Sequence, residues 1–425
     1  MNVIVVNDHL YADGGADVVA LSSAEELAAA GASVTLFVAD ALRANDRTER
    51  KARLVCTGQS DLLHDPKPIR AALQGLWNRT AARQLRALMA EHDPAATVVH
   101  LHSWTKSLSS SVVHAVRDAG FPLICTLHDY FSICPTGALY DFQSNRICRL
   151  EPMSGQCVRT HCDSRRYSHK LYRVARQAVQ SGRGGLPGDL REFIVVSRFS
   201  EALLRPHLPL DAQVIHVRNP IEIEPALATD LSDNRCVVMV ARPSRLKGTE
   251  LFLQACERAQ VQAVCIGEGP ERAKLERRFR NARFTGQLSR ADVSHEMRQA
   301  VALVLPSLGY ETQGLVVDEA AALGVPAVVA DTCAATDSVV HEGTGLVFKS
   351  ADVGSLAQAL RRMVDEPGLA ARLGAAAHER FWRDPPTPQA HARHLMQVYA
   401  GVIDRANGRS SLVPPSISSL DSVSL

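Results

Sequence analysis

Short apolar runs alternate with helical segments along most of this chain, and this alternation restricts the fold more than any other feature. Buried strands are predicted at residues 3–7, 34–38, 193–197, 237–241 and 301–306. Such alternation is typical of α/β domains with a doubly wound, mostly parallel sheet. Because 425 residues exceed what one hydrophobic core normally supports, we expect two such domains of about 180 to 200 residues each.

Two glutamates, Glu311 and Glu319, flank the start of a helix predicted over residues 314–323, directly after the strand at 301–306. Free backbone N–H groups at a helix start favour an anion, and carboxylates accept hydrogen bonds from hydroxyl groups. This combination suits a sugar joined to a nucleotide diphosphate. Two solvated glutamates at this spacing also arise by chance in helical proteins, so neighbouring segments have to support the interpretation.

Arg242 and Lys247 provide that support, because they lie on a loop between the strand at 237–241 and the next helix. An arginine fork and a lysine ammonium can both reach phosphate oxygens. Gly267 and Gly269 follow another apolar strand, although a single Gly-x-Gly sequence is weak evidence because glycine often serves only a tight turn. The loop with its two cations therefore predicts diphosphate binding.

The first half of the chain carries a Gly14-Gly15 pair between a predicted strand and a predicted helix. Two later strands deliver His102 and His128 at their carboxyl ends. Ligands of open parallel sheets bind at those ends. A lone histidine after a strand is more often structural, which is our expectation for His100.

Taken in order, an Arg-x4-Lys-Gly sequence, an Ile-Gly-Glu-Gly-Pro turn, Phe284-Thr285-Gly286, Pro306-Ser307 and the Glu-x7-Glu sequence resemble the donor half of retaining glycosyltransferases of family 4. The resemblance is strong over residues 236–365 and extends to the first half. It implies the GT-B fold, in which two Rossmann-like domains face each other across a cleft. It also implies retaining transfer of a hexose from a UDP- or GDP-sugar to a glycan or lipid-linked acceptor in polysaccharide or glycoconjugate biosynthesis, with no cofactor in catalysis.

The same resemblance assigns roles to residues. It implies that His128 contacts the donor sugar near the reacting carbon and that His102 lines the acceptor side. Glu311 would hold sugar hydroxyls, and Glu319 would accept from the nucleotide ribose. The predicted catalytic residues are thus His128, Arg242, Lys247 and Glu311, and further donor contacts are predicted at Gly14, Gly15, Gly267, Gly269, Thr312, Gln313, Gly314, Leu315 and Glu319.

Four regions are expected along the chain. Residues 1–218 should form the acceptor-binding domain and residues 219–385 the nucleotide-sugar-binding domain. Residues 386–406 are predicted to form a helix, which in this fold often crosses back to the first domain. Residues 407–425 are rich in serine and poor in large apolar side chains, so we expect them to be disordered.

Composition excludes several classes of protein. The chain has 47 Lys and Arg against 45 Asp and Glu, and a net charge of +2 does not favour nucleic-acid binding. No apolar run approaches the roughly 18 residues that cross a bilayer, and the first residues do not resemble a secretory signal. We therefore expect a cytoplasmic protein that is either free or peripheral on the inner face of the membrane.

Four of the ten cysteines crowd into one segment, an insertion at about residues 134–162. They are Cys134, Cys148, Cys157 and Cys162. Four thiolates can bind a structural zinc ion, with His161 as a substitute ligand, but no Cys-x2-Cys knuckle is present. Unpaired thiols and disulfides are the alternatives, and a reducing cytosol disfavours disulfides.

The segment at residues 165–176 is basic and amphipathic, and it lies in the predicted acceptor domain. Leu171, Val174 and Ala175 share one side of a helix, whereas the Arg and Lys side chains fall elsewhere. Such a helix suits anionic lipid headgroups or a lipid-pyrophosphate acceptor. The alternative is a solvated basic face on a helix that packs against its own domain.

Some positions depart from the family pattern. Gln313 stands where an aromatic residue is commoner, residues 243–245 alter the usual Arg-Leu sequence, and residues 331–334 replace a glycine-rich turn. The first and third departures lie near the donor sugar, so they leave its identity open. Two other functions stay open as well: a GT-B sugar-nucleotide epimerase or phosphorylase, and a non-catalytic nucleotide-sugar-binding subunit of a polysaccharide assembly complex.

Overall fold

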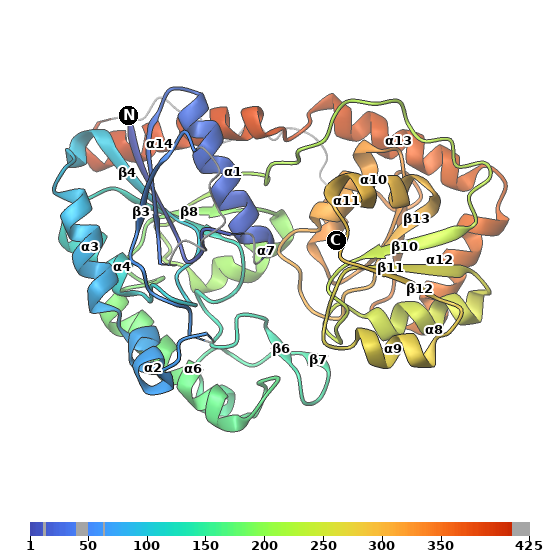
Figure 1. Cartoon of the computed structure of the whole chain (residues 1–425), viewed down its shortest axis with the longest axis horizontal. Helices are drawn as coiled ribbons and strands as arrows, with labels where there is room; N and C mark the ends of the chain where they lie inside the picture. The colour runs from blue at the N-terminus through green and yellow to red at the C-terminus, as the bar shows by residue number, and fades with distance from the viewer. Residues whose placement is uncertain (12–13, 40–49, 63, 410–425) are drawn as a thin grey trace.

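The computed structural model describes residues 1–11, 14–39, 50–62 and 64–409. These residues form two parallel sheets of seven and six strands, and helices pack against both faces of each (Figure 1). The fold class predicted from the sequence, two doubly wound α/β domains, is therefore confirmed.

The first sheet is entirely parallel, and its middle strands consist almost wholly of buried aliphatic residues, as expected where helices cover both faces. Its spatial order is β3 (Arg53–Cys56), β2 (Ser33–Val38), β1 (Asn2–Asn7), β4 (Thr97–Leu101), β5 (Leu123–Leu127), β8 (Glu192–Val195) and β9 (Gln213–His216). The helices of this part of the chain are α1 (Gly15–Ala29), α2 (Pro68–Leu76), α3 (Arg79–Met89), α4 (Ser111–Asp118), α5 (Gly155–Arg159), α6 (Tyr167–Val179) and α7 (Arg198–Leu204).

The second sheet is also parallel and shares one continuous hydrophobic core with its helices. Its order is β12 (Arg283–Gly286), β11 (Gln262–Ile266), β10 (Cys236–Val240), β13 (Ala300–Leu305), β14 (Ala327–Ala330) and β15 (Gly345–Phe348). Its helices are α8 (Thr249–Ala259), α9 (Arg272–Arg278), α10 (Arg290–Arg298), α11 (Leu315–Ala322), α12 (Val353–Asp365) and α13 (Leu369–Arg383).

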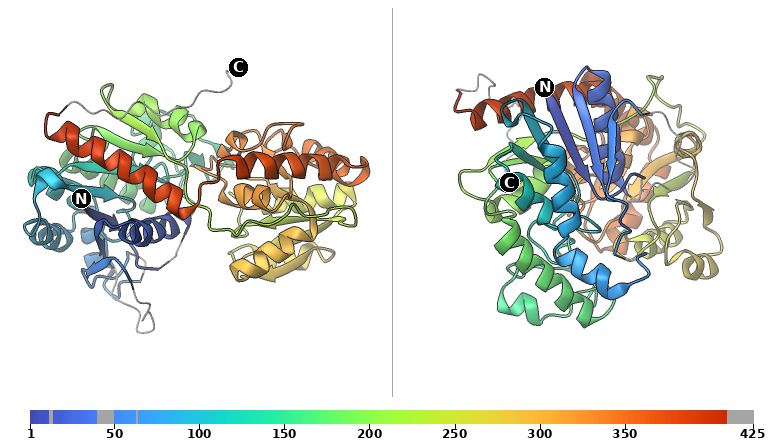
Figure 2. Two further views of the ribbon diagram at one scale, coloured as in Figure 1. Left: turned by 90° about the horizontal axis from the view of Figure 1, so that it is seen from above. Right: turned by 60° about the vertical axis from the view of Figure 1, so that its left-hand side comes forward.

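Helix α14 (Pro388–Ala406) leaves the second sheet and lies along the first, beside α1 (Figure 2). Proline at its first turn and Thr387 as its N-cap fix where it starts, because the Thr387 side chain accepts from the backbone N–H of Ala390. Its apolar side, which includes Leu395, Val398 and Val402, is buried in the core of the first sheet. The chain therefore passes from the first sheet to the second and back.

A two-stranded hairpin, β6 (Tyr140–Asp141) and β7 (Arg146–Ile147), projects from the first domain toward the second (Figure 1). Arg245 of the second domain donates to Asn145 of the hairpin at 3.4 Å. The hairpin therefore contacts the second domain.

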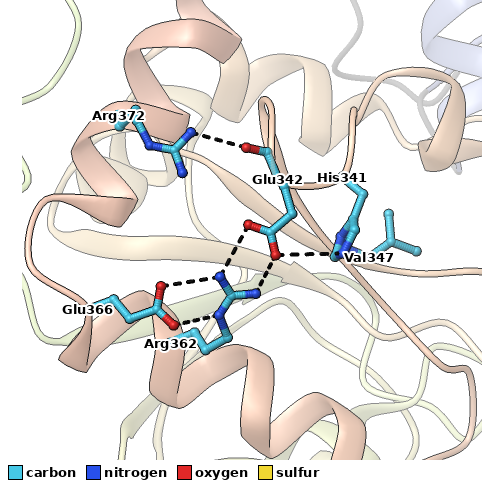
Figure 3. A network of polar contacts seen from close by, with 6 residues as sticks. All are labelled: His341, Glu342, Val347, Arg362, Glu366 and Arg372. Carbon is cyan, nitrogen blue, oxygen red and sulfur yellow. Dashed lines mark hydrogen bonds and ion pairs between the residues drawn. The ribbon is translucent and has the colours of Figure 1, made fainter.

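The outer surface of the second domain carries a network of ion pairs around Arg362 (Figure 3). Arg362 of α12 donates to Glu366 at 2.6 Å and also binds Glu342, whose backbone carbonyl accepts from Arg372 of α13 at 3.1 Å. The network joins the turn before β15 to both helices. Because these charges are largely exposed, we assign them a local structural role.

Among the described residues, no helix is both long and apolar enough to span a bilayer. The predicted disordered tail, residues 407–425, lies outside the described residues from position 410 onward.

Candidate functional site

Lys247 and Glu311, 64 positions apart in the sequence, meet at the carboxyl edge of the second sheet. The Lys247 ammonium lies 2.7 and 2.8 Å from the two carboxylate oxygens of Glu311. The buried Ser307 hydroxyl donates to the same carboxylate at 2.5 Å. The two residues come together because β10 and β13 are parallel neighbours, so the loops after them emerge at one edge.

Gly248 determines how closely the Lys247 loop approaches the strand beside it. Its φ is +70°, and an added Cβ would lie 1.9 Å from the carbonyl oxygen of Pro306, directly after β13. No side chain fits there. The loop is therefore held against the end of β13, which places Lys247 beside Glu311.

Arg242, the second predicted cation, lies at the start of the same loop. Its side chain packs beside Gly269, where an added Cβ would come 3.0 Å from Arg242 Cγ and 2.4 Å from the Pro243 carbonyl oxygen. Arg242 is exposed, and within the described chain it forms no ion pair or hydrogen bond. Of the two predicted cations, Lys247 is thus paired with a carboxylate and Arg242 is free.

The start of α11 faces the first domain. The Thr312 hydroxyl donates to the backbone carbonyl of His128 at 2.7 Å. An added Cβ on Gly15, the first residue of α1, would lie 3.7 Å from the Leu315 side chain. Gly14 and Gly314 are the N-cap residues of these two helices, so the structure brings both helix starts to the space between the sheets.

Two acceptor groups on and before α11 lack partners. Gln313 Oε1 is buried without a hydrogen-bond partner, and the Gln313 amide reaches Asp318 only at 3.4 Å. The half-buried Glu319 carboxylate has no hydrogen-bond partner in the part of the chain that the structure describes. Burial raises the pKa of Glu319 to about 7, Asp318 raises it further and Arg290 opposes the shift. Both groups can accept hydrogen bonds from a ligand.

We expect Glu319→Gln to stabilise the ligand-free protein at alkaline pH. The folded protein holds the Glu319 proton more tightly than the unfolded chain, so the stability contributed by this group is full below its ordinary pKa and is lost as pH rises through about 7. The Tm of the variant relative to wild type should therefore increase between about pH 5 and pH 8. Glu257→Gln, at an exposed position on α8, should show no such trend. A difference in Tm that is the same at both pH values would contradict the burial of the Glu319 charge.

His128 ends a chain of three histidines inside the first domain. His102 Nδ1 lies 2.9 Å from His128 Nε2, and His102 Nε2 lies 3.1 Å from His100 Nδ1. His100 also contacts the Tyr399 hydroxyl of α14 at 2.6 Å and the Thr126 hydroxyl at 2.7 Å. Burial lowers the pKa of His128 to about 3 and holds the pKa values of His100 and His102 well below their usual value. All three rings are therefore neutral near pH 7.

These contacts among the three histidines change the interpretation of His102. It is only 3% exposed and both of its ring nitrogens are engaged, so neither is left to line the predicted acceptor side. Asp129, which follows His128, accepts from the backbone N–H of Phe131 at 2.8 Å and so caps the next turn. His128 Nδ1 has no hydrogen-bond partner among the described residues, which leaves this atom for a ligand.

The four clustered cysteines surround a lysine. Lys170 is fully buried, and its ammonium lies 3.5 Å from Cys157 Sγ. Burial lowers the pKa of Lys170, but the sulfurs of Cys162 and Cys157 outweigh this effect and raise it. Cys134, Cys148, Cys157 and Cys162 form no disulfide, so the disulfide alternative is not realised.

The zinc site predicted at Cys134, Cys148, Cys157 and Cys162 is not supported by this geometry. Throughout the described ranges, no group of three or more His, Cys, Asp and Glu residues has an arrangement that holds a metal ion. The Lys170 ammonium already supplies the positive charge beside these sulfurs, and a second cation there would be repelled.

A pocket of about 640 Å³ separates the hairpin from the second domain. It is lined on one side by Asp141, residues 144–150 and Thr160, and on the other by Leu308, Thr332, Ser350 and Ala351. None of the predicted donor residues lines it. It is close in sequence to the predicted donor residues, because Leu308 is three residues before Glu311.

Comparisons with known proteins cover most of the chain. The family described as Glycosyltransferase Family 4 matches residues 13–224, and the family described as Glycosyl transferases group 1 matches residues 227–380. A glycogen synthase of Mycobacterium tuberculosis is 37% identical over 27% of this chain, and the match spans 27% of that relative's length.

Two further relatives match over longer ranges. The GDP-mannose-dependent monoacylated alpha-(1-6)-phosphatidylinositol monomannoside mannosyltransferase of Corynebacterium glutamicum is 25% identical over 69% of this chain and 87% of its own length. The solved structure of sucrose-phosphate synthase from Thermosynechococcus elongatus superposes with a TM-score of 0.71 at 21% identity, covering 95% of this chain and 99% of that one. At this identity the structural likeness shows a shared fold.

Proposed function

This chain belongs to glycosyltransferase family 4 and has the GT-B fold, and from that premise we propose that it is a retaining hexosyltransferase acting on a nucleotide-diphosphate-sugar. The observation that carries the proposal is the meeting of Lys247, Ser307 and Glu311 at the carboxyl edge of the second sheet. Ligands of such sheets bind at that edge. The proposed acceptor is a glycan or a lipid-linked molecule.

The charges at this edge suit the leaving group. As the bond between the anomeric carbon and the donor phosphate breaks, its electron pair passes to the phosphate oxygen and positive charge develops on the sugar. Fixed cations and backbone N–H groups near the diphosphate stabilise that state. We assign the free Arg242 guanidinium, the Lys247 ammonium and the N–H groups at the start of α11 and α1 to this role.

The Lys247–Glu311 pair does not exclude a phosphate. An ammonium group donates three hydrogen bonds, so Lys247 can bind a donor phosphate and Glu311 together. Glu311 then accepts from sugar hydroxyls through its remaining lone pairs, and its position is fixed by Ser307. Glu319, on the next part of α11, accepts from the ribose.

The acceptor hydroxyl attacks the anomeric carbon on the face from which the diphosphate leaves, and its proton passes to the departing phosphate oxygen. This route retains the anomeric configuration and needs no protein nucleophile. We assign His128 the neutral tautomer with its proton on Nδ1, in which Nε2, 2.9 Å from His102 Nδ1, is the acceptor. In this tautomer His128 donates to a sugar hydroxyl through Nδ1. His102 and His100 thus position His128 rather than contact the acceptor.

Gln313 bears on which sugar is transferred. Its buried Oε1 lacks a partner, and an unpaired buried acceptor costs free energy unless a ligand satisfies it. A donor sugar with a hydroxyl or amide N–H at that point satisfies it. A sugar without such a donor is disfavoured.

The division of the chain into an acceptor-binding domain, residues 1–218, and a donor-binding domain, residues 219–385, stays a prediction. Contacts between the two domains, such as the hydrogen bond from Thr312 to His128, place the predicted donor and acceptor residues close together and support this division. The nucleotide is UDP or GDP, and the use of GDP-mannose by the Corynebacterium glutamicum relative makes GDP the first choice to test.

Incubation of the purified protein with a panel of UDP-, GDP- and ADP-sugars tests the proposal. We expect one nucleoside diphosphate to raise Tm, since a ligand at 100 times its Kd adds about 2.7 kcal/mol of stability. We also expect slow release of free sugar from the matching donor. Binding without turnover, even with an acceptor extract, would identify the non-catalytic subunit, and a changed sugar configuration without transfer would identify an epimerase.

A further inference from the structure

Helices α2 and α6 pack together at one end of the first domain (Figure 1). Both helices expose large apolar side chains to solvent. Ile69 and Leu73, one turn apart on α2, are 78% and 63% exposed. Tyr167 and Leu171, one turn apart on α6, are 37% and 44% exposed. Half of the large hydrophobic side chains exposed in the described chain thus lie on these two helices, at spacings that place each pair on one helix face.

Helix α6 is turned opposite to what its sequence suggests. Lys170, Arg176 and Gln177 point into the domain, whereas Leu171 and Ala175 are exposed. Helix α6 thus packs against its own domain, as the alternative expected, but it does so through Lys170, Arg176 and Gln177. The burial of the polar side chains fixes this orientation, because Arg176 donates to the Thr105 carbonyl at 2.9 Å and Gln177 to the Ser132 carbonyl at 3.0 Å. Rotating the helix to hide its apolar face would break these bonds.

The two apolar faces belong to one surface. Tyr172 of α6 donates to the Ala72 carbonyl of α2 at 3.0 Å. Gly75 admits the Tyr172 ring, since an added Cβ would lie 2.2 Å from the Tyr172 hydroxyl oxygen. We call the exposed side chains of Ile69, Leu73, Tyr167, Leu171, Ala175 and Ala178 the α2–α6 surface.

Positive charge gathers around this surface. Residues 64–83 and 155–184 contain eleven Lys and Arg and two Asp. Lys170 and Arg176 are buried, and Arg70 and Arg173 pair with Asp65 and Asp163, which leaves seven exposed cations. Lys67, Arg165 and Arg166 are exposed at its rim, and within the residues that the structure describes they form no ion pair. The partner of this surface must therefore be apolar and carry negative charge.

We propose that the α2–α6 surface docks the protein onto an anionic lipid bilayer. Apolar side chains enter the headgroup region while the surrounding cations bind lipid phosphates. A second copy of the chain fits less well, because a two-fold contact would bring the same cations face to face. The inference rests on this surface alone and does not depend on the proposed sugar transfer.

Co-sedimentation of the full-length protein with lipid vesicles tests the proposal. We expect binding to phosphatidylcholine vesicles that contain about 30 mol % phosphatidylglycerol, weak binding to pure phosphatidylcholine, and loss of binding at about 0.5 M NaCl. Leu73→Asp and Leu171→Asp should each weaken binding about tenfold. Arg165→Gln combined with Arg166→Gln should weaken it about thirtyfold.

Leu210→Asp is the matched control, because Leu210 is 100% exposed on the same domain but outside the α2–α6 surface. It should bind vesicles as wild type does. Far-UV circular dichroism spectra and cooperative thermal unfolding should be retained in all four variants, which shows that they are folded and keeps this test separate from the proposed activity. Equal binding by Leu171→Asp and wild type would overturn the proposal. So would a wild-type dimer that dissociates on the Leu171→Asp substitution.

Discussion

Replacing Lys247 with alanine should lower kcat for sugar transfer by about 10² to 10³-fold, the usual effect of removing one group that stabilises developing negative charge. In the proposed mechanism Lys247 binds the leaving diphosphate, and in the structure it fixes Glu311, at 2.7 and 2.8 Å. Its loss therefore removes a cation from the transition state and leaves Glu311 held by Ser307 alone. Steady-state kinetics with the donor identified by the panel would measure kcat and KM separately.

Arg245→Ala is the control for this result. Arg245 lies on the same loop, but its exposed guanidinium contacts Asn145 at 3.4 Å and Glu271 at 3.9 Å instead of the carboxylate of Glu311. We expect its kcat to stay within about threefold of wild type, as for other exposed ion pairs of little energetic weight. If Lys247→Ala retained wild-type kcat, the assignment of the diphosphate to this loop would be wrong.

Replacing Gly248 with alanine should be the most destabilising single-methyl change near the site. The added Cβ would lie 1.9 Å from the Pro306 carbonyl oxygen, and alanine would also have to adopt a φ of +70°. We expect these two effects together to lower the free energy of unfolding by about 3 kcal/mol or more and Tm by about 6 to 12 °C. Thermal unfolding followed by circular dichroism measures both.

Gly368→Ala separates the effect of the positive φ from the effect of the contact with Pro306. Gly368 has a φ of +74°, but an added Cβ there would meet nothing within 4 Å. We expect it to cost about 1 kcal/mol, the conformational effect alone. Equal losses in the two variants would mean that the contact with Pro306 does not matter for the position of the Lys247 loop.

The middle strands of both sheets could be predicted because they are buried on both faces and therefore uniformly apolar. β1 and β13 are examples, with almost every residue buried. The edge strands β3 and β9 were not predicted, because each is only half-buried and mixes polar with apolar residues. Burial on one side only weakens the sequence signal.

The parts of the candidate site that depend on one short segment of sequence could be predicted. The loops after β10 and β13 supply Lys247 and Glu311 at positions that their own sequences indicate. The contacts between distant segments were not predictable. Tyr399 lies 299 positions from His100, and nothing in its helix signals that it completes the histidine chain.

Helix α6 shows that sequence periodicity alone does not predict how a helix is oriented in its domain. Its periodicity reveals two unlike faces but not which of them lies inside. Lys170 can be buried because Cys157 Sγ accepts a hydrogen bond from its ammonium group. Arg176 can be buried because the Thr105 carbonyl accepts a hydrogen bond from its guanidinium. Those acceptors come from other segments, so only the assembled domain decides the orientation.

The return of α14 to the first sheet has a consequence for biosynthesis. The ribosome completes β9 at His216, but the helix that covers the α1 side of that sheet follows only after the whole second domain. At about 5 to 20 residues per second, the nascent first domain waits roughly 10 to 40 s with that apolar side open. The first domain therefore cannot complete its core until α14 has been synthesised. A chaperone that shields the nascent sheet should raise the yield of native protein.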